Sequence, residues 1–360
     1  MSASTPVLEP GATIGILGSG QLGRMLALAA ARLGFKCHVF APNRDSPAFD
    51  VVHQTTCADY IDTPALERFA ASVDVVTYEF ENVPAEAAAF LAARVPVLPD
   101  PKVLATTQDR LAEKDFVAAL GIGTAPYAAI ATPADLSAAI ERVGRPAVLK
   151  TRRFGYDGKG QAAIKNGTAP DAAWREVGGQ PCILEAFVPF AREVSVVAAR
   201  AHDGTVQCFD VTENEHREHI LKVSRVPAAL SDAAAQEARR IAETIAHKFA
   251  YVGVLAVEMF VLRDGSLLVN EIAPRVHNSG HWTLDGASVS QFEQHIRAVA
   301  GWPLGTPIRH GRVEMINLIG SEVEDYRAWL KVAGTAVHLY GKAAVRPGRK
   351  MGHVTRVFAD

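Results

Sequence analysis

The sequence has few of the features that would reveal its class at once. Its four cysteines, Cys37, Cys57, Cys182 and Cys208, are scattered and form no C-x-x-C pair. This spacing argues against a disulfide framework or a zinc site, and it favours reduced thiols packed in a cytoplasmic protein. No apolar run approaches the roughly 18 residues that a membrane-spanning helix needs. Residues 1–11 also lack the cationic start and apolar core of a secretory signal, so neither a membrane partner nor export is expected.

An excess of charge of one sign is also missing. The chain has 37 Lys plus Arg and 39 Asp plus Glu among 360 residues, which gives a formal net charge of −2. Nucleic acid and anionic membranes attract proteins with a clear cationic excess on one face, so neither partner is expected. The length and the 49% share of apolar residues instead predict a globular protein of two or three domains, at roughly 100 to 200 residues each.

The first hundred residues alternate strand-like apolar runs with helical stretches. Strands are predicted over 13–17, 36–40, 73–78 and 95–98, and a helix over 21–33. This βαβ order is typical of a doubly wound parallel sheet in an α/β domain. Pro99-Asp100-Pro101 then interrupts the pattern, and one helical stretch is predicted over 103–120. We therefore assign residues 1–107 to an N-terminal, Rossmann-like domain.

From Pro146 onward, strands joined by Gly-rich turns indicate an α+β domain. The predicted elements are strands over 147–150, 182–187, 193–199, 255–262 and 266–272 and a helix over 231–251. Ser231 is a suitable N-cap for that helix, and Ile241, Ile245 and Phe249 follow one another at a helical spacing. We assign residues 108–304 to this central domain, and residues 305–360 to a small β-rich C-terminal module around a cationic segment.

A glycine-rich turn lies between the first predicted strand and the first helix. Gly18-Ser19-Gly20-Gln21-Leu22-Gly23 fits G-x-G-x-x-G, a loop whose backbone N–H groups can meet an anion. A dinucleotide site would add an acid at the end of the second strand, but Ala41 stands there and Asp45 lies beyond a proline. Two readings therefore rank above NAD. One is a turn that only packs the strand against the helix, and the other is a small phosphorylated ligand contacted by Gln21 and Leu22.

Two glutamates flank a predicted hairpin in apolar sequences that mirror each other. Asp264-Gly265 is a strong signal for a two-residue hairpin turn, and it separates Val257-Glu258-Met259-Phe260 from Val269-Asn270-Glu271-Ile272. If that turn closes the hairpin, the two sequence positions in every directly opposed pair add up to 529. Glu258 then lies directly opposite Glu271.

A carboxylate pair in this position predicts a metal. Directly opposed side chains have Cβ atoms about 4.5–5.5 Å apart, and like charges placed so need a neutralising cation. Oxygen ligands from two carboxylates and the amide of Asn270 suit Mg²⁺, whose other ligands are commonly waters and substrate phosphates. The alternative is a solvated hairpin face with ordinary surface glutamates.

Basic residues and glycines follow the strand that ends at Lys150. A lysine after three apolar residues could reach a phosphate, and three glycines lie among cationic neighbours in the segment 152–160. That segment is not a Walker A loop, because it contains no G-x-x-x-x-G-K-[ST]. It could close over phosphates while staying mobile, and the alternative is a flexible basic turn. Glu185 and Glu193 could meet the amine and the hydroxyls of a nucleoside.

Five motifs along the chain belong to one pattern. They are Gly18-Ser19-Gly20-Gln21-Leu22-Gly23, Tyr78-Glu79-Phe80-Glu81-Asn82-Val83, Gly155-Tyr156-Asp157-Gly158-Lys159-Gly160-Gln161, Asn270-Glu271-Ile272-Ala273-Pro274-Arg275-Val276-His277-Asn278-Ser279-Gly280-His281 and Arg346-Pro347-Gly348-Arg349-Lys350-Met351-Gly352-His353. Together they resemble the ATP-grasp enzymes, and within them the 5-(carboxyamino)imidazole ribonucleotide synthases of purine biosynthesis. The resemblance covers nearly the whole chain. Ala41 departs from it, because the family often has an acid there.

The resemblance implies an ATP-dependent carbon–nitrogen ligase of α/β and α+β class with the ATP-grasp architecture. Residues 1–107 would be the pre-ATP-grasp domain, 108–304 the ATP-grasp domain with a mobile lid over about 118–186, and 305–360 the C-terminal module. Bicarbonate would attack the γ-phosphate of ATP to give carboxyphosphate, which carboxylates 5-aminoimidazole ribonucleotide and leaves ADP and phosphate. The resemblance also implies Mg²⁺ as cofactor and a homodimer.

The resemblance assigns roles to individual residues. For ATP it implies Arg110, Lys150, Gly155, Gly158, Gly160, Gln161, Glu185, Ala186, Phe187, Val188, Glu193, His216, Asn270 and Glu271, and for the metal Glu258 and Glu271. For the imidazole ribonucleotide it implies Gln21, Leu22, Glu79, Lys342 and Arg349. For catalysis it implies Tyr156, Asp157, Lys159, Arg275, His277 and Lys350.

Several alternatives stay open. His277 and His281 have the H-x-x-x-H spacing of two zinc ligands on a helix, although Asn278-Ser279-Gly280 between them favours a loop. Glu79 could be a capping carboxylate, and the basic C-terminal run could be a solvated surface. The rival functions are a formate-using glycinamide ribonucleotide enzyme, a biotin carboxylase, an NAD-dependent oxidoreductase and a non-catalytic ATP-binding module.

Overall fold

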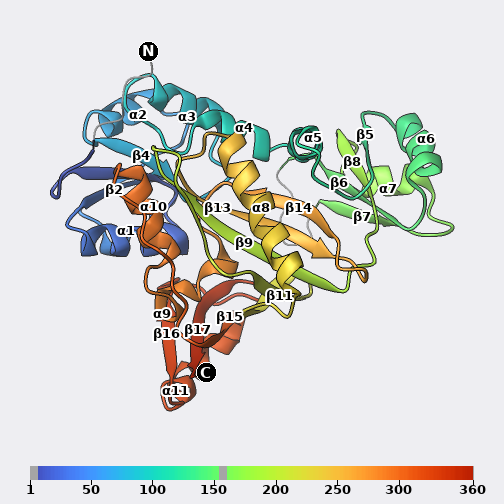
Figure 1. Cartoon of the computed structure of the whole chain (residues 1–360). Coiled ribbons are helices and arrows are strands. Elements are labelled where there is room, and N and C mark those ends of the chain that lie inside the picture. Colours follow the sequence, from blue (N-terminus) through green and yellow to red (C-terminus); the bar gives the residue numbers. More distant parts are fainter. Residues whose placement is uncertain (1–6, 154–159, 360) are drawn as a thin grey trace.

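The N-terminal part of the computed structural model, which describes residues 7–153 and 160–359, is a parallel sheet between two helical layers (Figure 1). Its strands run in the order β3-β2-β1-β4. They are β1 (Thr13–Leu17), β2 (Lys36–Ala41), β3 (Gln54–Cys57) and β4 (Val75–Tyr78), connected through α1 (Gln21–Arg32), the short η1 (Phe49–Val51), α2 (Thr63–Ala70) and α3 (Ala85–Ala92). The predicted doubly wound sheet is confirmed. The strand predicted over 95–98 is wrong, because only Val97 forms an isolated parallel bridge, to Val76.

The two faces of this sheet are buried by different helices. Leu22 and Leu26 of α1 pack with Ile14 and Ile16 of β1 in a core that also contains Phe292 of α10 (Gln291–Val299), a helix from much later in the chain. Helices α2 and α3 cover the opposite face in a separate core. Because α10 packs on α1 of the N-terminal part and on β9 and β13 of the central sheet, it joins the two halves of the molecule.

The helix predicted over 103–120 is wrong as a single element. The structure has α4 (Pro101–Thr107) and α5 (Arg110–Ala119), separated at Asp109. Asp109 has extended backbone angles, φ −115° and ψ 108°, and its side chain accepts the backbone N–H groups of Leu111 and Ala112. An aspartate that caps a helix N-terminus satisfies donors that the helix itself leaves unpaired. A new helix, α5, therefore begins after Asp109 and runs toward the central domain.

A smaller antiparallel sheet lies to one side of the molecule (Figure 1). Its strands run in the order β5-β8-β6-β7. They are β5 (Tyr127–Ile130), β6 (Ala147–Thr151), β7 (Gln161–Ile164) and β8 (Cys182–Ala186), with α6 (Pro133–Val143) and α7 (Pro170–Glu176) packed on one face. Helix α6 begins at a capping box of Thr132 and Asp135. This sheet occupies the region that the resemblance assigns to the lid.

In the described part of the chain, the largest sheet has nine strands in the order β14-β13-β9-β11-β12-β15-β17-β16, with β10 paired to β9. The strands are β9 (Arg192–Arg200), β10 (Val206–Cys208), β11 (Thr212–Arg217), β12 (Ile220–Val226), β13 (Gly253–Val261), β14 (Leu267–Ala273), β15 (Arg312–Ile319), β16 (Thr335–Leu339) and β17 (Lys350–Phe358). The short helices η2 (Asn278–Gly280), α9 (Thr283–Gly286), η3 (Gly320–Asp325) and α11 (Tyr326–Trp329) connect them. Because β15 pairs with β12, the C-terminal module continues the central sheet and forms no separate sheet of its own.

Helix α8 (Asp232–Lys248) lies across the large sheet at β9 and β13 (Figure 1). Ser231 accepts the N–H of Ala234, which confirms the predicted N-cap. The apolar face of α8 includes Ile241 and Ile245, and it packs on Val196 and Val257. No helix among the described residues is long and apolar enough to cross a membrane.

Candidate active site

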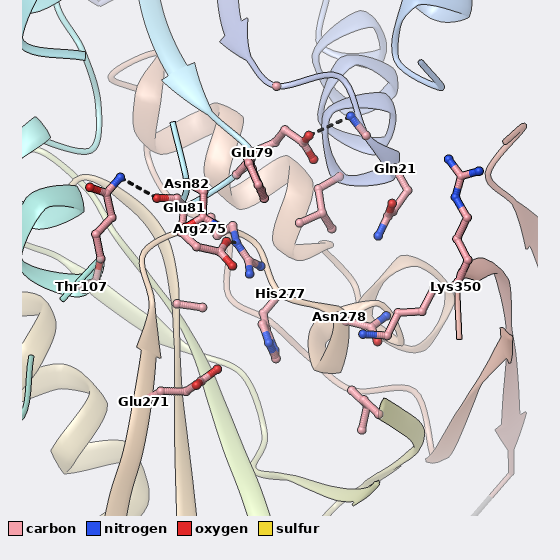
Figure 2. A pocket seen from close by; sticks show the side chains of 18 of the residues that line it. Gln21, Glu79, Glu81, Asn82, Thr107, Glu271, Arg275, His277, Asn278 and Lys350 are labelled. Carbon is pink, nitrogen blue, oxygen red and sulfur yellow. Dashed lines mark hydrogen bonds and ion pairs between the residues drawn. The ribbon is translucent and has the colours of Figure 1, made fainter. Parts of the chain in front are cut away.

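A cleft of about 1230 Å³ lies between the N-terminal sheet, the β13–β14 hairpin and the start of β17. Figure 2 shows Gln21 and Glu79 at one end of it and Glu271 at the other, with Arg275 and His277 between them. Residues predicted from far-apart motifs line it together: Gln21, Leu22, Glu79, Arg110, Lys150, Gly160, Gln161, Glu193, His216, Glu258, Asn270, Glu271, Arg275, His277, Lys342, Arg349 and Lys350. Gly155, Tyr156, Asp157, Gly158 and Lys159 lie outside the described residues.

The glycine-rich turn at one end of the cleft is closed by a carboxylate of the protein itself. Glu79, directly after β4, accepts the N–H of Gly20 at 2.7 Å and of Gly23 at 3.1 Å. Helix α1 has no acidic residue in its first turn and no side-chain cap, so Glu79 supplies the negative charge that its N-terminus favours. Glu79 is thus a capping carboxylate as well as a residue that lines the cleft.

All three glycines of the motif are needed for this approach. A Cβ at Gly18 would lie 2.7 Å from Glu79 Cγ, one at Gly20 would lie 3.0 Å from Glu79 Oε1, and one at Gly23 would lie 3.2 Å from the Gly18 carbonyl oxygen. In a dinucleotide site, the pyrophosphate takes the N–H groups that Glu79 accepts here. The same loop therefore argues against NAD in this protein. Burial raises the pKa of Glu79, and the two N–H groups oppose that rise.

At the other end of the cleft, the hairpin turn differs from the prediction. The turn has three residues, Arg263, Asp264 and Gly265. It is closed by a hydrogen bond that the N–H of Leu262 donates to the carbonyl oxygen of Ser266. Gly265 has φ +87°, the left-handed conformation that closes a three-residue loop. Near the turn, the paired residues therefore sum to 528, as in Met259 opposite Val269, and the predicted two-residue turn is wrong.

A β-bulge at Asn270 then corrects the register. The pairing shifts between Met259 and Glu258, so that Glu258 lies opposite Glu271, as predicted. The prediction of the opposed pair is confirmed, but the reason given for it was incomplete. A bulge inserts one unpaired residue and changes which side chains share a face, and no composition signal in β14 reveals it.

The opposed carboxylates perturb each other. Burial raises the pKa of Glu258 to about 7, and the charge of Glu271 adds to that rise. His277 Nε2 lies 3.3 Å from Glu258 Oε1. His277 Nδ1 accepts the N–H of Ser279 at 3.3 Å, so the neutral ring carries its proton on Nε2 and donates it toward Glu258. Burial, followed by the charge of Arg275, lowers the pKa of His277, which keeps this ring neutral.

The two histidines of the H-x-x-x-H motif face different surroundings. His277 faces the cleft, whereas His281 is buried beside Gln291 and the ring of Phe292. The residues between them form η2, a short 3₁₀ helix, and this separates the two rings. No group of three or more His, Cys, Asp or Glu suited to a metal ion occurs among the described residues.

Arg275 is held in the middle of the cleft by a partly buried ion pair. Its Nε donates to Glu81 Oε2, and its NH1 donates to the carbonyl oxygen of Val276 at 3.0 Å. Burial alone would raise the pKa of Glu81, but the charge and the hydrogen bond of Arg275, with smaller contributions from a backbone N–H and Lys350, together lower it. Gln108 donates to the carbonyl oxygens of Glu81 and Val83 at 2.7 and 2.6 Å, and so fixes the loop after β4.

The nucleotide residues predicted from the resemblance form two groups. The first lines the cleft and includes Arg110, Lys150, Glu193 and His216. Lys150 donates to Glu185 Oε2 at 3.0 Å, and Arg110 NH1 lies 3.5 Å from Glu271 Oε2. His216 and Glu193 form a hydrogen bond through Nδ1 and Oε2. Burial lowers the pKa of Lys150 despite the neighbouring Glu185 carboxylate.

The second group comprises the four residues at the end of β8, namely Glu185, Ala186, Phe187 and Val188. Among the described residues, none of these four is part of the cleft lining. Phe187 is 54% exposed, whereas Glu185 is buried and one of its oxygens, Oε1, lacks a hydrogen-bond partner within the described protein. An unsatisfied buried acceptor is costly, so this oxygen is suited to a donor from a ligand.

The basic C-terminal run lines the cleft and is not a solvated surface run. Lys342 Nζ donates to the carbonyl oxygen of Lys350 at 2.6 Å, and Arg349 NH1 donates to that of Ala344 at 2.9 Å. Burial, followed by the charge of Arg349, lowers the pKa of Lys342 to about 8. Cations gathered at one wall of a cleft are suited to a phosphate.

With this geometry established, comparisons with known proteins identify the family. Residues 11–108 match the model of the ribonucleotide synthetase preATP-grasp domain, 115–292 the ATP-grasp domain, and 314–360 the phosphoribosylaminoimidazole carboxylase C-terminal domain. A relative from Brucella melitensis, named N5-carboxyaminoimidazole ribonucleotide synthase, is 51% identical over 352 residues, which cover 97% of this chain and 97% of the relative. The chain belongs to the N5-carboxyaminoimidazole ribonucleotide synthase family.

Solved structures of this family agree with the fold. The ADP complex of one N5-carboxyaminoimidazole ribonucleotide synthetase has a TM-score of 0.96 at 40% identity, over 99% of this chain and 95% of that chain. The synthase of Aspergillus clavatus, in complex with ADP and 5-aminoimidazole ribonucleotide, has a TM-score of 0.90 at 31% identity, over 97% of this chain and 94% of that chain. The predicted ATP-grasp architecture and the class of carbon–nitrogen ligase are confirmed, while the domain limits at 107 and 304 stay predictions.

Reasoning from the sequence of this family member missed several residues of the site. They are Glu81, Asn82, Gln108, Asp109, Glu113, Lys114, Arg152 and Asn278. Glu81 and Asn82 lay within a quoted motif but received no role. Asp109, Glu113 and Lys114 were read as part of one polar helix, and the signal that could have found them is charged residues on the face that α5 turns toward β14.

Proposed function

We propose that this chain catalyses the ATP-dependent carboxylation of 5-aminoimidazole ribonucleotide with bicarbonate, in purine biosynthesis. The products are 5-(carboxyamino)imidazole ribonucleotide, ADP and phosphate. Membership of the synthase family supports this reaction along the whole chain. The observation that carries it is the opposed pair Glu258 and Glu271 at one end of a cleft that has basic residues at its other walls.

The donor set fits Mg²⁺. Two carboxylates that face each other while partly buried, one with a pKa raised by burial and then by the charge of its neighbour, need a cation to hold both charges. Few protein ligands are expected, because Mg²⁺ keeps waters and binds substrate phosphates. Glu258 and Glu271 would hold the ion, with Asn270 beside them. When bound, it would neutralise charge on the phosphoryl oxygens of ATP.

The nucleotide would lie along the lid side of the cleft. Arg110 and Lys150 would contact its phosphates, together with Gly155, Gly158, Gly160 and Gln161 of the glycine-rich segment. Glu185 would accept from the adenine amine through its unpartnered Oε1, with Ala186, Phe187 and Val188 beside the base. Glu193, oriented by His216, would accept from the ribose hydroxyls.

The imidazole ribonucleotide would lie at the opposite end. Gln21, Leu22 and Glu79 would contact the imidazole, while Lys342 and Arg349 would bind the 5′-phosphate. The remaining proposed catalytic residues are Tyr156, Asp157, Lys159, Arg275, His277 and Lys350. Arg275 is fixed by Glu81, so its charge is already in place where bicarbonate and the carboxyphosphate anion would form. Such preorganised cations stabilise developing charge without reorganisation at the moment of reaction.

The expected quaternary state comes from the family resemblance, and the expected cellular location comes from the composition of the sequence. A homodimer and a cytoplasmic location stay predictions, as does the mobility of the lid over 118–186. ATP, bicarbonate and 5-aminoimidazole ribonucleotide are the proposed small-molecule partners.

A substrate-omission assay tests the reaction. ADP release should require bicarbonate and 5-aminoimidazole ribonucleotide together. Robust turnover with glycinamide ribonucleotide and formate would instead assign the chain to a neighbouring activity. Fluorescence titration with NADH should show no binding, because Glu79 takes the N–H groups that a pyrophosphate needs.

A substitution tests whether the chain is a catalyst or only binds ATP. Glu271→Gln should abolish phosphate release and leave the circular dichroism spectrum unchanged. Glu237→Gln is the matched control, because Glu237 is an exposed carboxylate paired with Arg240 on α8. Equal turnover of Glu271→Gln and the control would refute the metal role of Glu271.

A further inference from the structure

Two consecutive charged residues of α5 are buried against the β14 backbone. Glu113 is 3% exposed and Lys114 is 2% exposed. Lys114 Nζ donates to the carbonyl oxygens of Val269 at 3.2 Å and Asn270 at 2.9 Å. It also lies 3.6 Å from Glu185 Oε2. Two of the ammonium N–H groups donate to these carbonyl oxygens, and the Glu185 carboxylate supplies a countercharge at ion-pair distance, which explains how a lysine is tolerated in this position.

Glu113 contacts the same strand on the other side of the bulge. Its Oε1 accepts the N–H of Ile272 at 2.6 Å. Lys114 therefore binds the two carbonyl groups before Glu271, and Glu113 binds the N–H group after it. Together the two side chains hold the backbone on both sides of the carboxylate proposed to bind the metal.

The bulge held in this way decides which side chain faces Glu258. Between the turn and the bulge, the paired residues sum to 528. If that pairing continued without the bulge, Glu258 would face Asn270, and Glu271 would turn to the other face of the sheet, because side chains alternate along a strand. The extra residue at Asn270 restores the pairing of Glu258 with Glu271.

We propose that Lys114 and Glu113 are positioning residues that stabilise the Asn270 bulge and thereby set the carboxylate pair. Lys114 is the main contributor, because its ammonium satisfies the carbonyl groups at a point where the ladder is interrupted. Through Glu185, which also binds Lys150, Lys114 ties the metal end of the cleft to the nucleotide residues of the lid. The proposal rests on the proposed function of Glu258 and Glu271.

Calorimetry of ADP binding, with and without Mg²⁺, tests this on the full chain. Wild-type protein should bind ADP more tightly with Mg²⁺ than without it. Lys114→Met should reduce that Mg²⁺-dependent gain by roughly 10–100-fold, the range seen when a residue that orients a metal ligand is removed. Lys114→Arg should restore part of it. Lys222→Met is the matched control, because Lys222 is largely buried and donates to the Asn317 carbonyl oxygen, away from the bulge.

A second variant separates register from stability. Deleting Asn270 removes the inserted residue, so that continuous pairing from the turn places Glu271 opposite Glu258 without a bulge. In the Lys114→Met background, this deletion should recover Mg²⁺-dependent ADP binding relative to Lys114→Met alone. This rescue also keeps the test decisive if Lys114→Met folds poorly, since the two variants are compared with each other.

The outcomes are distinguishable. If wild-type protein shows no Mg²⁺ effect on ADP binding, the proposed metal function of Glu258 and Glu271 fails. If the wild type shows the effect and a folded Lys114→Met keeps it in full, the positioning role is overturned while the metal site stands. Asn270→Ala in the wild-type background keeps the inserted residue and removes only its amide, so it measures what that side chain contributes to ADP binding. If the deletion gives no recovery in the Lys114→Met background toward the level of Asn270→Ala, the register argument is overturned.

Discussion

The cap that Glu79 forms on α1 can be tested by removing its two acceptor oxygens. Glu79 is 7% exposed and accepts the N–H groups of Gly20 and Gly23 at 2.7 and 3.1 Å. Glu79→Ala leaves both donors unpaired at a helix N-terminus that has no side-chain cap of its own. Each unsatisfied buried N–H costs about 1–3 kcal/mol, and water from the adjoining cleft can enter, so the lower end applies. The expected loss is about 2 kcal/mol, which is a factor of about 30 in the local opening equilibrium.

Hydrogen exchange followed by mass spectrometry measures this loss directly. Exchange of a peptide spanning residues 18–24 should be about 30-fold faster in Glu79→Ala, because the opening free energy falls by about 2 kcal/mol. Glu79→Gln keeps an acceptor but loses the charge-assisted bonds, so its effect should be smaller. Asp74→Asn is the matched control, because Asp74 is an exposed carboxylate that accepts the N–H of Thr13 at 2.7 Å. Unchanged exchange in Glu79→Ala would refute the capping role and reopen the turn to a ligand anion.

Three further predictions concern the cleft. The pKa of Lys342 is lowered to about 8, so its ammonium loses its proton as the pH rises above about 8. Because this ammonium is proposed to bind the phosphate, kcat/KM for the imidazole ribonucleotide should fall over the same pH range. Lys342→Arg should move this fall in kcat/KM to higher pH. Asp109→Asn keeps an N-cap acceptor at Oδ1 but loses the carboxylate charge and the Oδ2 acceptor of Arg152, so ATP KM should rise several-fold with little change in thermal stability. An unchanged KM would exclude a role in ATP binding. Lys350→Ala should chiefly lower turnover or ribonucleotide affinity, and unchanged steady-state kinetics would remove this residue from the site.

The ends of the regular elements followed from sequence where one local signal decided them. Thr13–Leu17 and the helix that starts after Ser231 were predicted at or near their observed bounds, because apolar alternation and an N-cap are local features. The single helix over 103–120 failed for a local reason as well. Asp109 is of a type favoured at helix N-caps, but the sequence around it has no glycine or proline that marks a break, and its role as a cap became evident only from its backbone angles and hydrogen bonds.

The clustering of the site residues depended on the resemblance and on the tertiary structure. Gln21, Glu79 and Lys350 lie far apart in the chain, and elementary patterns assign each of them only a local role. The ion pair between Glu81 and Arg275 joins residues separated by 194 positions, and no local pattern predicts a partner at that distance. The resemblance supplied that grouping, and the cleft then showed which of its members share one space.

By itself, the sequence determined the βαβ start, the absence of a dinucleotide acid at Ala41, the two mirror-image strands and the family motifs, because each is written in adjacent residues. The tertiary structure decided the rest. It closed the glycine turn with Glu79, extended the central sheet through β15 and β17, and put Glu271 opposite Glu258 through a bulge. A bulge and a buried cap are stabilised by contacts across the chain, such as those of Lys114, so their cause lies in packing and not in local spacing.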